Sequence, residues 1–377
     1  MDTEESKHSQ SGGLLRTVTE RVLLSVVVST RNSESTLRQV LTAIRGSELP
    51  RKSFEIIVVD DASADGSVAI AARFADTVVK LTGHQAGPAY ARNRGVELAR
   101  GEVIAFVDSE VVVRPDTIPR LMRTLLERPE VDAVSATHEE SSGSPNFVSQ
   151  YWNLLLSFGE HRHSGRGAQF AAGCGVVLRA ALLSAGMYDE WRFDTPSMES
   201  VELGERLLGA GRGVILCPEL KVSHLKKWDF ASVCQEVWHR GRVLARSLGY
   251  FRMSAVAPGE VMFTLCRTLI PAVAILGTLM LAAAFVPAPH PSAKFGVALA
   301  ALFLTNLPVH RFYAETRGLW FAVASAPLHI LVQIVAAIAL CTGWILRDVF
   351  GDVSPDATTQ AYSEVGLEIW PPVPRRP

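Results

Sequence analysis

The chain has 377 residues, of which 20% are charged, and its formal net charge at pH 7 is −1. Such a balance gives no indication of bulk nucleic-acid binding. The five cysteines are widely spread and form no C-x-x-C pair, which argues against a disulfide framework and against a zinc site and favours a reducing compartment. The length is enough for two domains, or for one domain followed by a region of another kind.

Residues 1–20 are polar and lack an apolar core, so we expect a disordered tail and no signal peptide. From residue 21 onwards, apolar runs rich in valine and isoleucine alternate with helical patterns. Continuous apolar strands separated by helices are typical of a mostly parallel α/β sheet that is covered on both faces. The predicted strands are 22–30, 54–61, 77–81, 102–110 and 131–137.

Three of these strands end in polar residues, at 30–32, 60–61 and 108–110. In parallel sheets, ligands bind outside the carboxyl ends of the strands. One such ending could simply be a strand end followed by a helix cap, but three of them together predict a cleft. The sequence contains neither a G-x-G-x-x-G turn after the first strand nor a G-x-x-x-x-G-K-[ST] motif, which disfavours a dinucleotide-binding fold and a P-loop enzyme.

The pair Asp108 and Glu110 carries the most information about chemistry. In an extended segment, side chains at positions i and i+2 point to the same side. Two carboxylates in this arrangement can hold one hard cation, Mg²⁺ or Mn²⁺, and leave coordination positions open for phosphate oxygens. The alternative interpretation is a solvated turn after a strand, because carboxylates are usually exposed.

Four stretches together resemble family 2 glycosyltransferases of the GT-A fold, over about Leu24 to Arg242. They are "SVVVSTRN", "IIVVDDASADGS", "GPAYARNRGVELARGEVIAFVDSE" and "AAGCGVVLRAALLSAGMYDE". The resemblance implies an inverting enzyme that moves a sugar from a nucleotide-diphosphate sugar, a UDP- or GDP-sugar, to an acceptor hydroxyl. On this basis residues 21–255 form the glycosyltransferase domain.

The resemblance also assigns roles to individual residues. It implies that Asp60 and Asp61 bind the nucleoside, that Asp108 and Glu110 hold the metal and the sugar diphosphate, and that "AAGCG" (171–175) lines the sugar and acceptor cleft. The remaining donor contacts are assigned to Thr30, Arg31 and Arg92, and His224 is assigned to the metal. For Arg92 the alternative is a position on a helix surface, and for His224 it is a role in fixing its own loop.

Two departures from the family pattern bear on catalysis. The usual D-x-D motif ends here in Glu110, which is one methylene longer. The catalytic base usually belongs to an E-D pair before "x-x-L-x-x-R-L", and this chain has Glu199-Ser200 at that place. We therefore predict Glu199 as the base, with Glu202 second and Asp194 third. Carboxylates also favour helix N-termini for dipole reasons alone.

Two other functions stay open at this point. The missing aspartate favours a catalytically inactive homologue that scaffolds a membrane assembly. A nucleotidyltransferase shares the sheet and the acidic metal site, but it usually needs a glycine-rich basic loop, and "STRNSESTL" is not one.

The second half of the chain contains long apolar runs at 268–286, 295–309 and 319–346. A membrane span needs about 20 mostly apolar residues, so we predict about three transmembrane helices within 260–347; buried core helices are the alternative. The distribution of arginine predicts a multi-pass protein of the plasma membrane with a cytoplasmic catalytic domain. The acceptor is then a lipid-linked or polyprenyl-linked molecule, or a glycan.

Two flanking segments complete the prediction. Residues 228–250 alternate apolar and arginine-rich positions at helical spacing, which indicates an amphipathic helix. This helix could lie on the anionic inner leaflet, or it could pack against the domain. The tail at 348–377 is predicted to be unstructured and to lie on the far side of the membrane.

Overall fold

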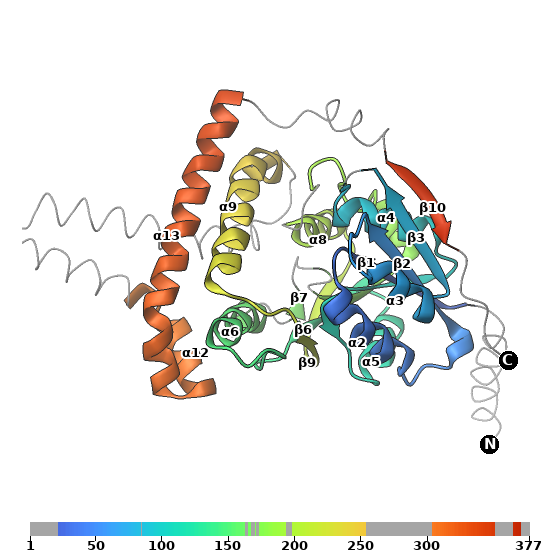
Figure 1. The fold of residues 1–377 in the computed structure, drawn as a ribbon, viewed down its shortest axis with the longest axis horizontal. Helices are drawn as coiled ribbons and strands as arrows, with labels where there is room; N and C mark the ends of the chain where they lie inside the picture. Colours follow the sequence, from blue (N-terminus) through green and yellow to red (C-terminus); the bar gives the residue numbers. More distant parts are fainter. Residues whose placement is uncertain are drawn as a thin grey trace, which may run out of the picture.

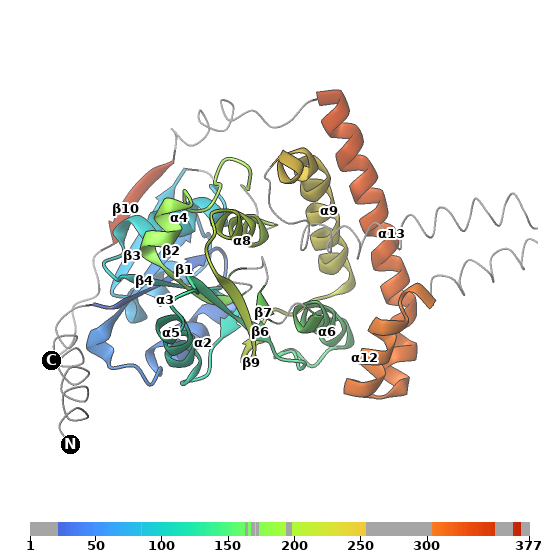
Figure 2. The ribbon, with the colours of Figure 1, turned by 180° about the vertical axis from the view of Figure 1, so that it is seen from behind.

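The computed structural model describes residues 22–83, 85–162, 165–166, 170, 173–193, 198–253, 304–350 and 365–370. The described part is a mixed sheet of ten strands with helices on both faces, flanked by two long helices that lie side by side (Figures 1 and 2). The strand order is β10-β3-β2-β1-β4-β8-β6-β9-β5, and β7 pairs with β9.

One half of the sheet is parallel, as predicted. It consists of β1 (Leu24–Thr30), β2 (Phe54–Asp61), β3 (Thr77–Thr82) and β4 (Val103–Val107), with α2 (Glu34–Arg45), η2 (Arg51–Ser53), α3 (Ser67–Phe74) and α4 (Pro88–Leu98) between them. Every residue of β2 is buried, which is why this strand reads as a continuous apolar run. Alternate residues serve opposite faces: Val26 packs toward α2, whereas Val27 packs toward α4.

The other half of the sheet is mixed. It contains β5 (Val111–Val112), β6 (Ala133–His138), β7 (Gly165–Arg166), β8 (Cys174–Leu178) and β9 (Val214–His224), with α5 (Thr117–Glu127), α6 (Phe147–Arg162), α7 (Arg179–Ser184) and α8 (Glu199–Gly209). The strand predicted at 131–137 does not continue the parallel series, because β8 lies between β4 and β6 and is antiparallel to both. An apolar run indicates a buried strand but does not indicate its neighbours.

The C-terminal region contains α9 (Phe230–Met253), α12 (Leu307–Arg317) and α13 (Leu319–Phe350). Within α13, the stretch Leu319–Leu346 is long and apolar enough to cross a membrane, judged by length and composition alone, and it is the one such helix in the described part of the chain. The apolar run at 268–286 and most of the run at 295–309 lie outside the described residues. The multi-pass arrangement therefore stays a prediction.

Helix α9 packs between the catalytic domain and α13. Gly241 lies against Ala339, and Gly343 lies so close to Arg242 that an added Cβ would come within 2.7 Å of its carbonyl oxygen. The charged side, for which a lipid leaflet and the domain were both open as contacts, contributes Glu236 and Arg240 to a pocket of the catalytic domain. The domain-packing alternative therefore describes α9.

The prediction that the tail is unstructured is wrong for residues 366–370, whereas the side of the membrane on which the tail lies stays a prediction. They form β10 (Gly366–Trp370), which pairs antiparallel with β3 from Gly366 opposite Thr82 to Trp370 opposite Val78 (Figure 1). Without this pairing, β3 would be an open edge with unpaired backbone groups. The chain beyond α13 thus returns to the sheet of the catalytic domain.

Candidate functional site

A pocket of about 260 Å³ opens at the carboxyl ends of β1, β2 and β4. It brings together side chains from strand ends that are far apart in sequence, and α4 and α9 supply further walls. Of the predicted site residues, the pocket is lined by Thr30, Arg31, Asp61, Arg92, Asp108, Glu110 and His224. The three polar strand endings therefore do converge on one cleft, as the sequence predicted.

Two buried polar atoms without a hydrogen-bond partner lie at the ends of β1 and β2; Thr30 lines the pocket, whereas the predicted site residue Asp60 is not among its lining residues. Thr30 and Asp60 lie opposite each other in the register of β1 and β2. Thr30 Oγ1 and Asp60 Oδ1 are both buried and unpaired, while Asp60 Oδ2 accepts a hydrogen bond of 3.0 Å from the Ser63 N–H. Burial raises the pKa of Asp60. Buried polar atoms are rarely left unsatisfied, so this corner suits a polar ligand group.

The neighbouring carboxylate, Asp61, binds the backbone that leads into α4. Its two carboxylate oxygens accept hydrogen bonds from the backbone N–H groups of Ala86 and Gly87, at 2.8 and 2.9 Å. Gly87 has a φ of 93°, a conformation that favours glycine, and α4 begins directly after it. Asp61 therefore fixes the start of α4 and with it the position of Arg92, one turn further along.

Arg92 is buried and joins two acidic side chains of the site. Its Nη2 donates to Asp108 Oδ1 at 2.9 Å, and its Nη1 donates to Glu199 Oε1 at 3.0 Å. Burial alone would lower the pKa of Arg92, but Asp108, Tyr188 and Glu199 outweigh burial and the pKa is raised. The guanidinium therefore stays charged and ties α4 to the end of β4 and to α8. This is not the helix-surface position of the alternative interpretation.

The three predicted metal ligands line the same pocket without forming a closed site. His224 Nε2 lies 3.9 Å from Glu110 Oε2, whereas Asp108 pairs with Arg92. Burial, followed by the positive charges nearby, lowers the pKa of His224 to about 3, so its imidazole is in the neutral form that binds metals. Among the described residues, no three His, Cys, Asp or Glu side chains converge as a metal site.

This donor set nevertheless fits a divalent cation that is shared with a ligand. Two carboxylates and a neutral imidazole offer oxygen and nitrogen atoms of the right kind, and Mg²⁺ typically takes only one or two carboxylates together with phosphate oxygens. The protein side chains would supply part of the coordination and a bound diphosphate the rest.

Among the pocket residues that were not predicted as site residues, four with charged or aromatic side chains come from the segment after β9 and from α9: Lys226, Trp228, Glu236 and Arg240. Lys226 Nζ lies 3.8 Å from Glu110 Oε2 and 4.2 Å from the ring centre of Trp228. Arg240 Nε donates to Glu236 Oε1 at 2.5 Å, four residues back on the helix. The two basic side chains give the acidic pocket a cationic wall on the side of α9. The i,i+4 spacing of Glu236 and Arg240 indicated a helical ion pair but not the surface that it faces.

The candidate bases occupy different environments. Glu199 is 5% exposed and is not among the residues that line the pocket, but Arg92, which does line it, binds both Glu199 and Asp108. Glu202 is 0% exposed and is bound by Arg206 Nε and Nη2, and the same guanidinium donates to the carbonyl of Met187 at 2.5 Å. Asp194 lies outside the described residues.

A buried histidine–glutamate pair lies behind the predicted metal ligands. His138 Nδ1 is 2.6 Å from Glu160 Oε1, and the His138 ring is centred 5.6 Å from the ring of His224. Gly173, in the "AAGCG" stretch, has a φ of 87°, and a Cβ there would come within 3.1 Å of His138 Nε2. Only glycine suits this position, so backbone and imidazole lie in direct contact. No sequence motif pointed to His138 or Glu160.

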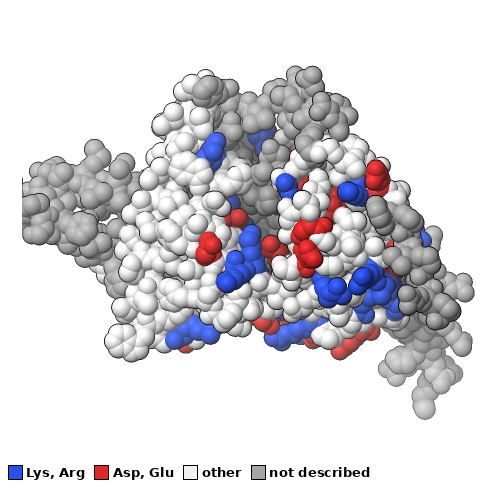
Figure 3. Space-filling view, viewed as in Figure 1, with Lys and Arg blue, Asp and Glu red and all other residues white. Residues whose placement is uncertain are grey.

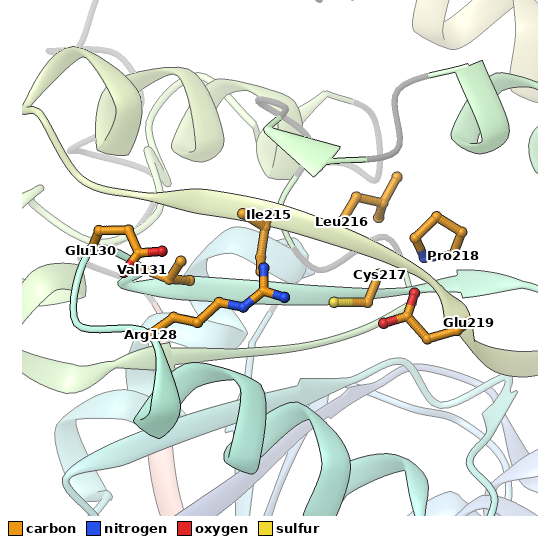
Figure 4. Close-up of a pocket in the computed structure, with 8 residues that line it drawn as sticks. All are labelled: Arg128, Glu130, Val131, Ile215, Leu216, Cys217, Pro218 and Glu219. Carbon is orange, nitrogen blue, oxygen red and sulfur yellow. The ribbon is translucent and has the colours of Figure 1, made fainter.

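A second cavity, of about 340 Å³, contains none of the predicted site residues. It lies beside β9, and Figure 4 shows Arg128 reaching toward Cys217 and Glu219 along this strand. Burial raises the pKa of Cys217 to about 11, so its thiol is protonated at neutral pH and is a poor nucleophile. This cavity is larger than the pocket at the strand ends, but its lining residues do not include a comparable set of carboxylate, imidazole and cationic side chains.

Comparison with known proteins gives a consistent result. Residues 25–186 match the family model described as Glycosyl transferase family 2. The chain is 33% identical over 98 residues to the poly(ribitol-phosphate) beta-N-acetylglucosaminyltransferase TarS of Staphylococcus aureus. The matched stretch covers 25% of this chain and 17% of TarS. It is 30% identical over 211 residues to the pre-mycofactocin glycosyltransferase of Mycobacterium tuberculosis, covering 53% of this chain and 42% of that protein. The chain thus spans less than half the length of these curated relatives.

Among solved structures, the fold is similar to that of the mannosyltransferase PcManGT from Pyrobaculum calidifontis, solved in complex with GDP-Man and Mn²⁺. The TM-score is 0.58 at 21% identity, and the match covers 83% of this chain and 88% of that one. This likeness confirms the predicted GT-A fold.

Proposed function

Because residues 25–186 form a glycosyl transferase family 2 domain, we propose that the chain transfers a sugar from a nucleoside diphosphate sugar to an acceptor hydroxyl, with inversion at the anomeric carbon. The observation that carries this proposal is the pocket at the strand ends, where the unpaired hydroxyl of Thr30, carboxylates and cationic side chains occur in one cavity. A nucleoside, a metal-bound diphosphate and a sugar need these three kinds of group.

The nucleoside is proposed to bind at the corner between β1 and β2. The unpaired Thr30 Oγ1 and Asp60 Oδ1 can each take a hydrogen bond from a base or a ribose hydroxyl, which would satisfy them. Arg31, at the mouth of the same pocket, can pair with a phosphate. The donor is a UDP- or GDP-sugar, and PcManGT provides an example with GDP-Man.

The diphosphate is proposed to lie between Glu110, His224 and the cationic wall of Lys226 and Arg240. A bound Mg²⁺ or Mn²⁺ would supply charge neutralisation for the departing diphosphate. Asp108, Glu110 and His224 would hold it, and PcManGT was solved with Mn²⁺. Lys226 and Arg240 can stabilise the same developing negative charge directly, through charge-assisted hydrogen bonds.

Glu199 is the proposed general base, which takes the proton of the acceptor hydroxyl. Its contact with Arg92 orients the carboxylate and holds it next to Asp108, where the diphosphate end of the donor would lie. Glu202 is the weaker candidate because Arg206 engages its carboxylate in the interior. Ser200 cannot replace the missing aspartate, since its hydroxyl is neutral at working pH.

The acceptor is proposed to be a lipid-linked molecule or a glycan at the membrane. Two observations support a membrane link: α13 contains a stretch long and apolar enough to cross a bilayer, and the pocket wall α9 packs directly against α13. TarS, by its name, acts on poly(ribitol phosphate).

The proposal is tested by incubating the full chain in membranes with UDP- and GDP-sugars and Mn²⁺, and by mass spectrometry of the lipid and glycan fractions. We expect a product one sugar heavier, which is absent with Asp108→Asn. The matched control Asp116→Asn, at the partly exposed N-cap of α5, should leave product formation unchanged. The second candidate function is an inactive scaffold, favoured by Ser200. Donor binding without any transfer to an acceptor or to water would support it.

A further inference from the structure

Helix α13 carries an apolar stripe along its outer side. Large apolar side chains are exposed along this side at intervals of three, four, seven or eight residues, which keeps them on one side of a helix. They are 38% to 86% exposed and comprise Trp320, Val323, Leu331, Ile334, Ile338 and Ile345. Figure 3 shows the surface over α13, at the left of the described part, as mostly uncharged, whereas charged side chains gather over the catalytic domain. An apolar surface of this length on a soluble protein marks an interaction site.

The inner side of the same helix carries its polar residues. His329 and Gln333 are buried, at 4% and 5% exposure. His329 Nδ1 is 2.9 Å from Tyr151 Oη, and its Nε2 is 3.1 Å from Asn306 Oδ1, which also accepts from Gln333 Nε2 at 2.6 Å. A helix at a water surface instead carries polar and charged residues on its outer side.

The rest of the inner side is apolar, since Ala322, Val332, Ala336, Ala339 and Leu340 are also buried. Helix α13 is therefore apolar on both sides and keeps its few polar groups inside, and this distribution indicates the surroundings of the helix. Where the surroundings are hydrocarbon, polar groups must be satisfied within the protein and apolar groups can face outward. We therefore propose that the outer stripe of α13 is a contact face for the hydrocarbon region of a lipid bilayer. The chain leaves the described part at Met253, the end of α9, and returns at Leu304, before α12. The sequence between these points contains the apolar run 268–286, which has no Asp, Glu, Lys or Arg and is about as long as a bilayer crossing requires.

The anchoring of α13 indicates that it lies along the membrane and does not cross it. At its start, Arg317 of α12 donates to Gln150 of α6 at 2.6 Å. Along its length α13 packs on α9, and beyond its end β10 pairs with β3 (Figure 2). If α13 crossed the bilayer, residues 351–365 would have to cross back. They include Asp352, Asp356 and Glu364, and a segment with such charges is a poor membrane crossing.

The arrangement has a consequence for the acceptor. One side of α9 packs against α13, and the other side contributes Glu236 and Arg240 to the pocket. The pocket would thus lie one helix away from the lipid surface, within reach of an acceptor whose reactive end emerges from the bilayer. Only this consequence rests on the proposed function; the lipid contact itself does not.

The test is a measurement of the depth of α13 in the full chain reconstituted in lipid nanodiscs. Val323→Cys, Ile334→Cys and Ile345→Cys are spin-labelled one at a time, in a background with Cys234→Ser, Cys266→Ser and Cys341→Ser; the remaining cysteines, Cys174 and Cys217, are buried. Collisions with oxygen and with a water-soluble nickel complex report the depth of each label. Leu126→Cys, on the exposed surface of α5, is the matched control and should be accessible to the nickel complex.

We expect the three labels to lie at a similar depth, about 5–10 Å into the headgroup and acyl boundary. A spanning helix would instead give depths that change by about 1.5 Å per residue, and this would overturn the flat orientation. Nickel accessibility at all three labels would overturn the lipid contact. So would protection from both reagents, which would mean that protein covers the stripe. Donor binding, measured on the same samples, reports the proposed function independently.

A second measurement addresses the sides of the membrane. Epitopes at residue 1 and at residue 377 should both be inaccessible in intact cells and both accessible after permeabilisation. Labelling of the C-terminal epitope alone in intact cells would contradict the return of β10 to the catalytic domain.

Discussion

The Nη1 atom of Arg92 lies 3.0 Å from Glu199 Oε1, and both side chains are almost completely buried. The contact links the helix that follows β3 to the helix that carries the proposed base. Because the same guanidinium also binds Asp108, the position of the base and the position of the proposed metal ligand depend on one residue.

Removal of Arg92 should therefore affect stability as well as activity. Arg92→Ala leaves the Glu199 carboxylate buried without this partner, and breaking a buried pair in this way costs about 3–5 kcal/mol of unfolding free energy. Urea unfolding of the full chain in detergent measures this change. Arg120→Ala breaks an exposed i,i+4 pair with Asp116 and serves as the control, with an expected loss of about 0.5 kcal/mol or less. Equal losses for the two variants would contradict the role given to Arg92.

Glu199→Gln tests the general base. It keeps the shape of the side chain but removes the basic oxygen, so kcat should fall by a factor of about 10²–10⁴. Nucleotide affinity should change little, because no donor contact is assigned to Glu199. Glu202→Gln should lower stability more than kcat, since it weakens the buried contact with Arg206. If both variants turn over at the normal rate, the base lies elsewhere or the acceptor arrives already ionised, as a phosphate would.

Asp108→Asn and Glu110→Asp test the metal assignment. Asp108→Asn removes a ligand charge and should abolish turnover while the protein still folds, as judged by circular dichroism. Glu110→Asp restores the usual spelling of the motif and should retain activity that depends on Mg²⁺ or Mn²⁺. Chelation with EDTA should stop transfer by the wild type and by Glu110→Asp. Metal-dependent transfer by Asp108→Asn would rule out the assignment of Asp108.

The cationic wall on α9 makes a separate prediction about the donor. Arg240→Ala and Lys226→Ala each remove a charged group that we assign to the diphosphate. A hydrogen bond to a charged group contributes about 1.5–3 kcal/mol, so the Kd of the nucleoside diphosphate should rise roughly 10- to 100-fold. The affinity for the free nucleoside should stay nearly constant. Arg311→Ala, on the exposed surface of α12, is the control for the loss of one positive charge.

The parallel half of the fold could be predicted because its signal is local. The run from Ile56 to Val59 is buried on both faces, and such strands read as continuous apolar runs in any sequence. The insertion of β8 between β4 and β6 could not be predicted, since the run "CGVVL" does not indicate its neighbours. Strand β10 is only five residues long, and its partner, the edge of β3, lies almost 300 residues earlier in the chain.

The site shows the same division between local and distant information. Asp61, Asp108 and Glu110 follow apolar strands directly, so their convergence at one edge follows from the parallel arrangement. The pairing of His138 with Glu160 and the entry of Arg240 into the pocket depend on how distant helices pack. The sequence pattern of α9 correctly predicted an apolar and a charged face, but it did not indicate that the charged face lines the pocket.

The most direct test of the central claim is a calorimetric titration of the full chain with UDP and with GDP in the presence of Mn²⁺. We predict saturable binding of one nucleoside diphosphate at a single site, weakened when Mn²⁺ is omitted and weakened further in Thr30→Val, which removes the unpaired hydroxyl at the base of the pocket. If neither UDP nor GDP binds the wild-type chain with Mn²⁺ present, or if Thr30→Val and Arg240→Ala bind as tightly as the wild type, the pocket at the strand ends is not the donor site.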